Sequence, residues 1–301
     1  MKDQIEIKGL NKFYGKKQAL RNVNLTIRQG MFGLLGPNGA GKTTFMKVLV
    51  TLLPRKEGEI TVCGIPIENR AEIRRIIGYL PQDFSMYPSM NVAEALDYLA
   101  ILSGLSGPVR RERIERLLAR VNLTEHRHKK VGALSGGMKR RLGVAQALLN
   151  DPKVLIVDEP TAGLDPEERV RLRNLLAEVA GDRIVILSTH IVGDIEAACE
   201  DIAIMDQGQV IYDGTVEHLL DAAEGQVFTI TADKKELPRL KSELAITGMH
   251  SQGQKTVLRF LSADPPPGAV AGEPNMEDAY MLYLHKNGIA APSREPEEGG
   301  R

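Results

Sequence analysis

Residues 36–44 combine glycines, a lysine and two hydroxyl side chains at the spacing of a phosphate-binding loop. The run reads GPNGAGKTT. Glycines let backbone N–H groups point inward around a phosphate, and a following helix N-terminus adds partial positive charge. The lysine of this pattern reaches the β- and γ-phosphates of a nucleotide, and the first hydroxyl binds Mg²⁺. We expect the following residues to form a nucleotide site: Gly36, Pro37, Asn38, Gly39, Ala40, Gly41, Lys42, Thr43 and Thr44.

Two carboxylates end a second apolar run, VLIVDEP at residues 154–160. The four apolar residues predict a buried strand, and ligands of open α/β sheets bind beyond the carboxyl ends of the strands. We expect Asp158 to hold Mg²⁺ and Glu159 to activate a water molecule against the γ-phosphate. Acidic residues also end many strands without any chemical role. The phosphate-binding loop is what favours the chemical interpretation here.

The elements that must position these residues follow an α/β pattern. MFGLLG, residues 31–36, is a continuous apolar run that predicts a strand buried on both sides, and residues 42–53 have helical apolar spacing that Pro54 ends. Residues 154–214 alternate between strand and helix patterns, which predicts a parallel sheet with helices on both faces. Residues 5–30 and 58–67 predict antiparallel hairpins, and residues 92–131 are rich in helix patterns.

Composition and charge exclude several classes of protein. The chain has 301 residues and a formal net charge of zero, so no basic surface for nucleic acid is indicated. Its two cysteines, Cys63 and Cys199, lack neighbouring metal ligands and suit a reducing compartment. The N-terminal residues form no secretory signal, and no run approaches the roughly 20 apolar residues of a membrane span. We expect a cytoplasmic chain that meets a membrane only peripherally.

The character of the sequence changes near Gly225. QVFTITA and KTVLRFL read as strands, and NMEDAYMLYLHK reads as a closing helix, which together predict a small α+β appendage. The polar end, SREPEEGGR, has the composition of a disordered segment. We therefore expect a first domain at residues 1–224, an accessory region at 225–288 and a disordered tail at 289–301.

A third motif, LSGGM at residues 134–138, lies before the VLIVDEP strand. Ser135 is a good N-cap for the following helix, and the free N–H groups of a helix start form a second anion site. Together with the two motifs above, this combination resembles the ATPase subunit of ATP-binding cassette (ABC) transporters. The resemblance runs from Met1 to about Gly225, with the motifs in the order that the family has.

The resemblance implies both an architecture and an assembly. It implies a P-loop NTPase core with a mostly parallel sheet, an antiparallel β subdomain and a helical subdomain that carries the LSGG motif. In the family, Ser135, Gly136 and Gly137 would contact the γ-phosphate held by a second ATP-binding subunit, so that two ATP molecules lie in a head-to-tail pair. Asp165, in AGLD, matches the aspartate that bridges the two subunits. Two copies of this chain would form a homodimer.

Further family positions match one at a time. Tyr14 matches the aromatic residue that stacks on adenine, with Phe13 as the less suitable neighbour and packing on the core as the plain alternative. Gln82 matches the glutamine that touches Mg²⁺ and the attacking water. His190 matches the histidine that hydrogen-bonds the γ-phosphate, although a histidine after an apolar strand is more often structural. The resemblance thus assigns catalysis to Glu159, His190 and Gln82, and metal binding to Thr43, Gln82 and Asp158.

One position departs from the family pattern, because Met138 stands where LSGGQ has glutamine. Ser135 and Gly137 are intact, so we expect the chemistry to survive. Apolar residues at 84, 86 and 87 lie in a loop, which the family uses as a groove for a separate integral membrane permease subunit; packing under the helical subdomain is the alternative.

The predicted function is ATP binding and hydrolysis that powers transport, with export favoured. The alternative is a non-transport cassette ATPase that acts on ribosomes or DNA. About 90 residues separate Thr43 from Leu134 without the sustained heptads of the DNA-associated relatives, and the chain has a single P-loop. Nothing in the sequence identifies the transported compound.

Overall fold

The computed structural model describes residues 3–289, which form two compact units divided between Asp213 and Gly214. The boundary predicted after residue 224 lies beyond helix α8 (Val216–Asp221). Because α8 packs against α10 (Met276–Lys286), it belongs to the second unit. The predicted tail from residue 289 lies outside the described residues, apart from Ile289.

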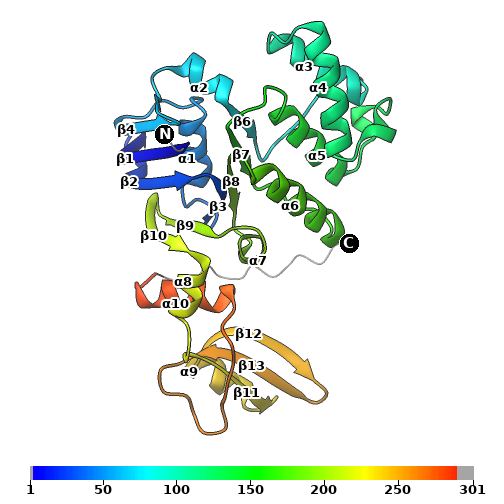
Figure 1. The fold of residues 1–301 in the computed structure, drawn as a ribbon. Coiled ribbons are helices and arrows are strands. Elements are labelled where there is room, and N and C mark those ends of the chain that lie inside the picture. Colours follow the sequence, from blue (N-terminus) through cyan, green and yellow to red (C-terminus); the bar gives the residue numbers. More distant parts are fainter. Residues whose placement is uncertain (1–2, 290–301) are drawn as a thin grey trace. The chain divides into compact units, whose positions relative to one another are not determined.

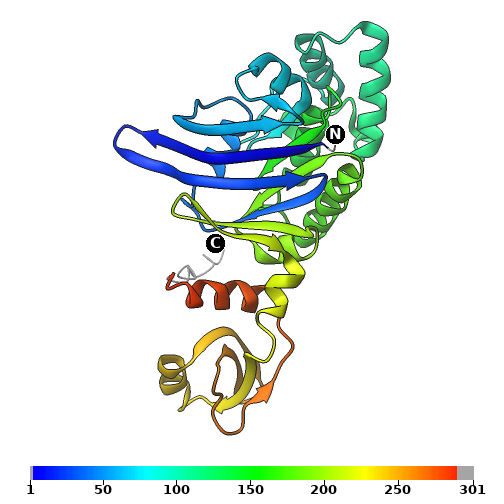
Figure 2. The same cartoon turned by 60° about the vertical axis from the view of Figure 1, so that its left-hand side comes forward.

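An antiparallel sheet opens the first unit. Its order is β2-β1-β4-β5, with bounds β1 Gln4–Tyr14, β2 Lys17–Arg28, β4 Glu57–Val62 and β5 Ile65–Pro66. The long β1–β2 hairpin turns at Gly15, whose positive φ of 57° suits a residue without a Cβ (Figure 2). β4 and β5 pair antiparallel around Cys63 and Gly64. Both predicted hairpins are confirmed.

A six-stranded sheet of order β10-β9-β3-β8-β7-β6 forms the centre of the first unit (Figure 1). Its strands are β3 Gly30–Leu35, β6 Ile77–Leu80, β7 Val154–Asp158, β8 Ile184–Thr189, β9 Asp201–Asp206 and β10 Gln209–Thr215. The pairs β6–β7, β7–β8, β3–β8 and β3–β9 are parallel. β7 and β8 are buried along their whole length, as continuous apolar runs require. The predicted, mostly parallel sheet is confirmed.

Helix α1 (Lys42–Leu49) lies in the core between the two sheets. Its Phe45 joins one hydrophobic cluster with Ile7 of β1 and with Phe32, Ile156 and Ile186 of the central sheet. Side chains alternate along a strand, so Asp158, two positions after Ile156 in β7, also faces α1. The predicted helix was too long, because residue 51 adopts a left-handed φ of 60° and ends the regular helix earlier. Helices α6 (Pro166–Ala180) and α7 (Val192–Glu196) contact β3 and β8.

Helices α3 (Val92–Leu102), α4 (Gly107–Arg120) and α5 (Gly136–Ala147) contact one another in a separate helical group (Figure 1). Short 3₁₀ turns at Thr124–His126 and Val131–Ala133 lead into α5. Helix α2 (Arg70–Ile76) precedes β6. The expected helical subdomain with the LSGG motif at the start of one helix is confirmed.

The second unit is a small α+β structure, as predicted. Its sheet has the order β12-β13-β11-β14, with bounds β11 Val227–Asp233, β12 Ala245–Gln252, β13 Lys255–Leu261 and β14 Val270–Ala271. Helix α9 (Leu237–Glu243) packs on it through Leu240, which contacts Ala232 and Leu258. Helix α10 contacts β12 and β13. Across residues 3–289, none of the helices has the length and apolar character that crossing a membrane demands.

Candidate nucleotide site

The phosphate-binding loop joins β3 to α1 and lines a cavity of about 700 Å³. Two of its glycines are required by the backbone. A Cβ on Gly36 would lie 2.3 Å from the carbonyl oxygen of Met205, and Gly41 caps α1 with a φ of 106°. The loop residues that line the cavity are Pro37, Asn38, Gly39, Ala40, Gly41, Lys42, Thr43 and Thr44.

Lys42 places a buried positive charge at the floor of this cavity. Its Nζ donates to the carbonyl oxygens of Gly36 at 2.5 Å and Pro37 at 3.2 Å, and it lies 3.5 Å from Oε1 of Glu159. Burial lowers the pKa of the Lys42 ammonium, and the neighbouring Glu159 carboxylate partly opposes that shift. A phosphate in the cavity would therefore stabilise an ammonium that is already removed from water.

Asp158, at the end of β7, shares its two carboxylate oxygens between α1 and β8. Thr43 Oγ1 donates to Oδ2 at 2.9 Å, and Ser188 Oγ donates to Oδ1 at 3.2 Å. Burial raises the pKa of Asp158, and the two hydrogen bonds oppose that shift. Hydroxyl and carboxylate oxygens are ligands that Mg²⁺ prefers, and a nearby cation would stabilise the buried carboxylate. The donor set therefore fits a magnesium ion.

Glu159 directs a buried carboxylate toward the same cavity. Its backbone has a left-handed φ of 48°, and its N–H donates to the carbonyl of Ser188 at 2.9 Å. Oε2 lies 2.8 Å from Nδ1 of His190. Oε1 accepts no hydrogen bond from the part of the chain that the structure describes. Oε1 is buried and lies 3.5 Å from the ammonium of Lys42, so the carboxylate has one oxygen at His190 and the other at Lys42.

The opposite wall of the cavity is formed by the β1–β2 hairpin. Tyr14 lines the cavity and is 47% exposed, and Lys12 Nζ lies 5.3 Å from the centre of its ring. Phe13 lies under the ammonium of Lys56 and does not line the cavity. An exposed ring at the rim of the cavity can stack on a flat base. Gln82 also lines the cavity.

Several lining residues were missed by sequence reasoning. They are Lys17, Gln18, Ala19, Arg21, Gln207 and Gly208. Lys17 could have been suspected from the sequence, because it belongs to the lysine pair of the FYGKK turn next to Tyr14. Gly208 reaches the loop because its N–H donates to the carbonyl of Ala40 and its carbonyl accepts from the N–H of Arg21, both at 2.8 Å. Such contacts depend on which strands become neighbours in the fold, and no short sequence motif predicts them.

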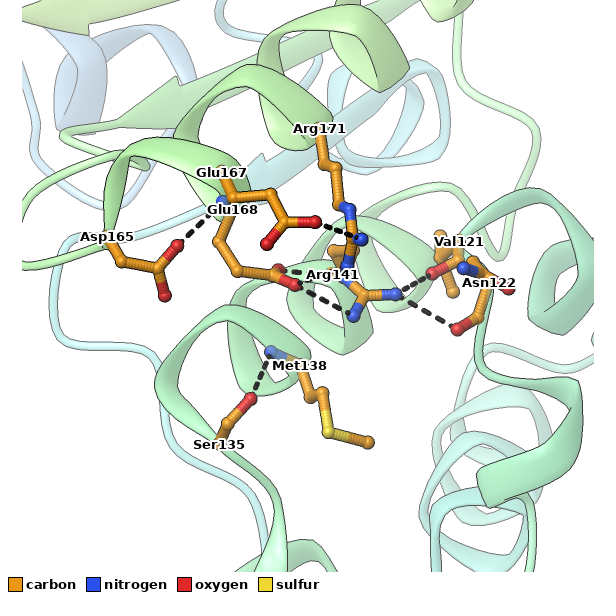
Figure 3. Close-up of polar contacts among 9 residues, drawn as sticks. All are labelled: Val121, Asn122, Ser135, Met138, Arg141, Asp165, Glu167, Glu168 and Arg171. Atoms are coloured by element: carbon orange, nitrogen blue, oxygen red, sulfur yellow. Dashed lines mark hydrogen bonds and ion pairs between the residues drawn. The ribbon is translucent and has the colours of Figure 1, made fainter.

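A second cluster of predicted residues lies at the starts of α5 and α6 (Figure 3). Ser135 caps α5 by accepting from the N–H of Met138 at 3.2 Å, and Asp165 caps α6 by accepting from the N–H of Glu168 at 2.9 Å. A Cβ on Gly136 would lie 3.9 Å from Leu164, next to Asp165. None of Ser135, Gly136, Gly137 and Asp165 lines the 700 Å³ cavity. One chain therefore presents two separate groups of predicted ATP contacts.

Buried Arg141 fixes this second cluster, and it was not singled out in the sequence. It donates to Glu168 Oε2 at 3.2 Å and to the carbonyls of Val121 and Asn122 at 2.8 and 2.9 Å (Figure 3). The Glu168 carboxylate lies over Gly137, where a Cβ would be only 2.3 Å from Oε2. The arginine compensates an acidic group beside the helix start, and glycine is the residue that leaves it room.

An apolar cavity of about 340 Å³ adjoins α3. Phe84 and Met86 line it together with Ala95 and Leu99 of α3, so they pack beside the helical group. Tyr87 also lines it, is 58% exposed, and contacts Tyr98 edge to face with 5.8 Å between ring centres. Phe84 and Met86 therefore pack, as the alternative interpretation predicts, while Tyr87 keeps more than half of its side chain on the surface.

Comparison with known proteins gives the family. Residues 20–162 match the family model described as ABC transporter. The chain is 40% identical over 232 residues to the ABC transporter ATP-binding protein YxlF of Bacillus subtilis, covering 77% of each. It is 36% identical over 291 residues to a Nod factor export ATP-binding protein of Cupriavidus metallidurans, covering 94% of this chain and 93% of the relative.

A similar solved structure is a dimeric ATP-binding cassette in a post-hydrolysis state bound to ADP and Pi. It is 29% identical with a TM-score of 0.63, and the match covers 70% of this chain and 98% of that one. The chain therefore belongs to the ABC transporter family, as one of its ATP-binding proteins.

Proposed function

We propose that this ATPase works as a head-to-tail pair that closes on two ATP molecules and drives export through a separate membrane subunit. The proposal rests on one observation: within one chain, the predicted ATP contacts lie in two separate places. The phosphate-binding loop lines the 700 Å³ cavity, whereas Ser135 and its glycines begin a different helix outside that cavity. A second copy would bring its α5 start to the first cavity. The similar solved cassette, which is a dimer bound to ADP and Pi, supports this arrangement.

In the proposed site, Lys42 and the inward backbone N–H groups bind the phosphates while Tyr14 stacks on the adenine. Thr43, Asp158 and Gln82 would hold Mg²⁺, which supplies neutralisation of phosphate charge. Lys42 would turn from the carbonyl oxygens of Gly36 and Pro37 toward the nucleotide. The stabilisation is electrostatic, and it is strong because these groups are removed from bulk water.

Hydrolysis would begin at Glu159, whose buried Oε1 accepts no hydrogen bond from the described residues and would be released for the water when Lys42 turns to the nucleotide. A water molecule attacks the γ-phosphorus in line, its proton passes to Glu159, and the bond to the leaving oxygen of ADP breaks. His190 contacts the other carboxylate oxygen at 2.8 Å, so it would orient Glu159, and the family resemblance gives it a hydrogen bond to the γ-phosphate of a bound nucleotide. Ser135, Gly136 and Gly137 of the second subunit would contact the same γ-phosphate, with Asp165 bridging the pair.

Coupling to transport would use the apolar cavity beside α3. Exposed Tyr87 and the groove residues Phe84 and Met86 suit a short helix of a membrane permease that docks on the cytoplasmic face. The Nod factor export name of a relative that covers most of the chain favours export. ATP would make some of its contacts only in the closed pair, so it would bind the closed state more tightly than the open one. That difference in affinity would drive the membrane subunit from one access state to the other.

The first test of this function is phosphate release by the purified chain. Glu159→Gln should lower the rate at least about 100-fold, the usual scale for loss of a general base. ATP binding, followed by isothermal titration, should persist. Glu178→Gln, an exposed carboxylate of α6, is the matched control and should retain the parent rate. Undiminished hydrolysis by Glu159→Gln would remove the assigned base.

The membrane partner is tested with the same variant. Tagged Glu159→Gln protein, with ATP and Mg²⁺, is used to capture partners from detergent-solubilised membranes of the native cell. Recovery of one dominant polytopic membrane protein supports transport. Recovery of ribosomes or DNA-bound proteins without a membrane protein would contradict transport and leave the ATPase chemistry in place.

A further inference from the structure

We propose that Arg140 is a positioning residue that ties helix α5 to the backbone of Gln82, so that events at the nucleotide reach the apolar groove. The inference rests on the proposed function, because it gives Gln82 a place at the nucleotide. Arg140 belongs to the helix that begins at Ser135, yet it points away from that helix start to a different motif. It would act through Gln82 rather than by contact with ATP.

The contacts of Arg140 are specific. Nη1 donates to the carbonyl oxygen of Gln82 at 2.5 Å and to that of Pro81 at 3.3 Å. The side chain is half-buried; burial lowers the pKa of its guanidinium, and the charges of Asp83 and Asp158 oppose that shift. Both hydrogen bonds come from one nitrogen of a planar guanidinium, which holds its N–H donors in fixed directions, whereas the ammonium of a lysine is a point charge on a flexible stem.

The segment that Arg140 holds passes between the two cavities of the first unit. Gln82 lines the nucleotide cavity, whereas Pro81 on one side of it and Asp83 to Tyr87 on the other line the apolar groove. A displacement of the Gln82 backbone would therefore move the groove wall within one or two residues. Arg140 holds this backbone at the point where the segment changes from one cavity to the other.

Tight packing behind the segment reinforces the hydrogen bonds. A Cβ on Gly143 of α5 would lie 2.5 Å from Leu80 Cδ1 and 3.0 Å from Phe84 Cδ1. A Cβ on Gly78 of β6 would lie 2.1 Å from the carbonyl oxygen of Ala147. Because α5 touches β6 and Phe84 with no spare room, the helix and the segment are expected to move as one body. Arg140 supplies the polar part of that connection.

The experiment uses the absence of tryptophan from this chain. Tyr87→Trp introduces a single fluorophore into the groove and conserves an aromatic ring against Tyr98. The full-length reporter protein is titrated with ATP and Mg²⁺, while isothermal titration measures the affinity independently. The same reporter then carries Arg140→Gln, Arg140→Lys or, as a matched control on the exposed face of α4, Arg116→Gln.

The reporter should change its fluorescence when ATP binds. Arg140→Gln should abolish most of that fluorescence change, while the affinity for ATP stays close to that of the parent. The fluorescence change of Arg140→Lys should lie between those of the parent and Arg140→Gln, and that of Arg116→Gln should match the parent. A residue that only supports the fold would lower the melting temperature and leave the fluorescence change intact.

Full fluorescence change in Arg140→Gln, with binding intact, would overturn the inference. So would a reporter that binds ATP without any change in the groove. If Arg140→Gln does not fold, Arg140→Lys decides, and an undiminished change in that variant contradicts the inference. A reporter protein that neither binds nor hydrolyses ATP would instead refute the proposed function itself, so the two failures are distinguishable.

Discussion

At the scale of single residues, Glu159 is the proposed general base of the site. It is buried, its backbone adopts a left-handed conformation, and its carboxylate lies between Lys42 and His190. Strain of this kind persists where surrounding contacts fix it, and it is common at functional sites. The left-handed conformation gives the carboxylate a direction that a regular continuation of β7 would not give.

Ser188 is a residue whose importance follows from strand register. It pairs with Asp158 across β7 and β8 and donates to Oδ1 of that carboxylate. Ser188→Ala should raise the Mg²⁺ concentration for half-maximal ATPase about 10-fold, the low end for loss of an outer partner of a metal ligand. Hydrolysis at varied Mg²⁺ measures the shift. Ser103→Ala, exposed after α3, should not move it; an equal response of both variants would contradict this role for Ser188.

Much of the site was predictable because its motifs are local. The phosphate-binding loop, Asp158, Glu159 and the Ser135 cap occupy short stretches whose residue types carry the chemistry directly. Ser188, Arg141 and Gly208 depend on which strands and helices become neighbours, and no short stretch carries that information. Tyr14 and Phe13 were separable only after the hairpin placed one ring at the cavity and the other under Lys56.

At the scale of elements, close packing of β6 against α5 sets a strict requirement at Gly78. A Cβ there would lie 2.1 Å from the backbone oxygen of Ala147, which cannot turn aside as a side chain can. Gly78→Ala should lower the free energy of unfolding by about 3 kcal/mol, the upper range for overpacking. Urea unfolding followed by circular dichroism measures the loss. Gly107→Ala has open space around its Cβ and serves as the control; equal stability of the two variants would show that the close approach is relieved cheaply.

In the second unit, Asp278 joins α10 to the sheet. Its oxygens accept from Thr247 at 2.6 Å, from Arg259 at 2.8 Å and from the N–H of Asn275 at 3.0 Å. Burial acts to raise the pKa of Asp278, but the hydrogen bonds outweigh it and hold the pKa below the ordinary value. A lowered folded-state pKa stabilises the fold above the unfolded-state value, and that contribution disappears as the pH falls through the folded-state value.

Asp278→Ala should therefore destabilise the second unit by about 3 kcal/mol at neutral pH, the scale for breaking a buried ion pair. The difference from the parent should shrink as the pH falls below the ordinary aspartate value of 3.8. Hydrogen exchange of the backbone amides of β12 and β13 measures this difference in stability for the second unit alone. Exposed Asp264→Ala is the control. A difference that does not change with pH would show that packing, rather than charge, holds α10.

At the scale of the whole molecule, the sequence predicted the layers better than the division between units. Hairpins, the central sheet and the helical group followed from apolar patterns that hold over many residues. The boundary depends on α8, whose partner α10 is remote in sequence. β12 was missed because AITGMHSQ carries few apolar residues, and its strand conformation is fixed by pairing with β13.

In the proposed pair, each ATP site is completed by a second chain. Lys42→Ala and Ser135→Arg, purified separately, should each hydrolyse ATP very slowly, because both sites of either homodimer lack an essential group. In a mixed pair, the intact Lys42 of one chain meets the intact Ser135 of the other, so one complete site forms.

Phosphate release by the mixture therefore shows whether a second chain completes the site. Activity well above the sum of the two separate proteins, rising with the fraction of mixed pairs, is the predicted result. Activity equal to that sum, from folded proteins that are shown to form mixed pairs, would mean that the site is complete within one chain and would contradict the account.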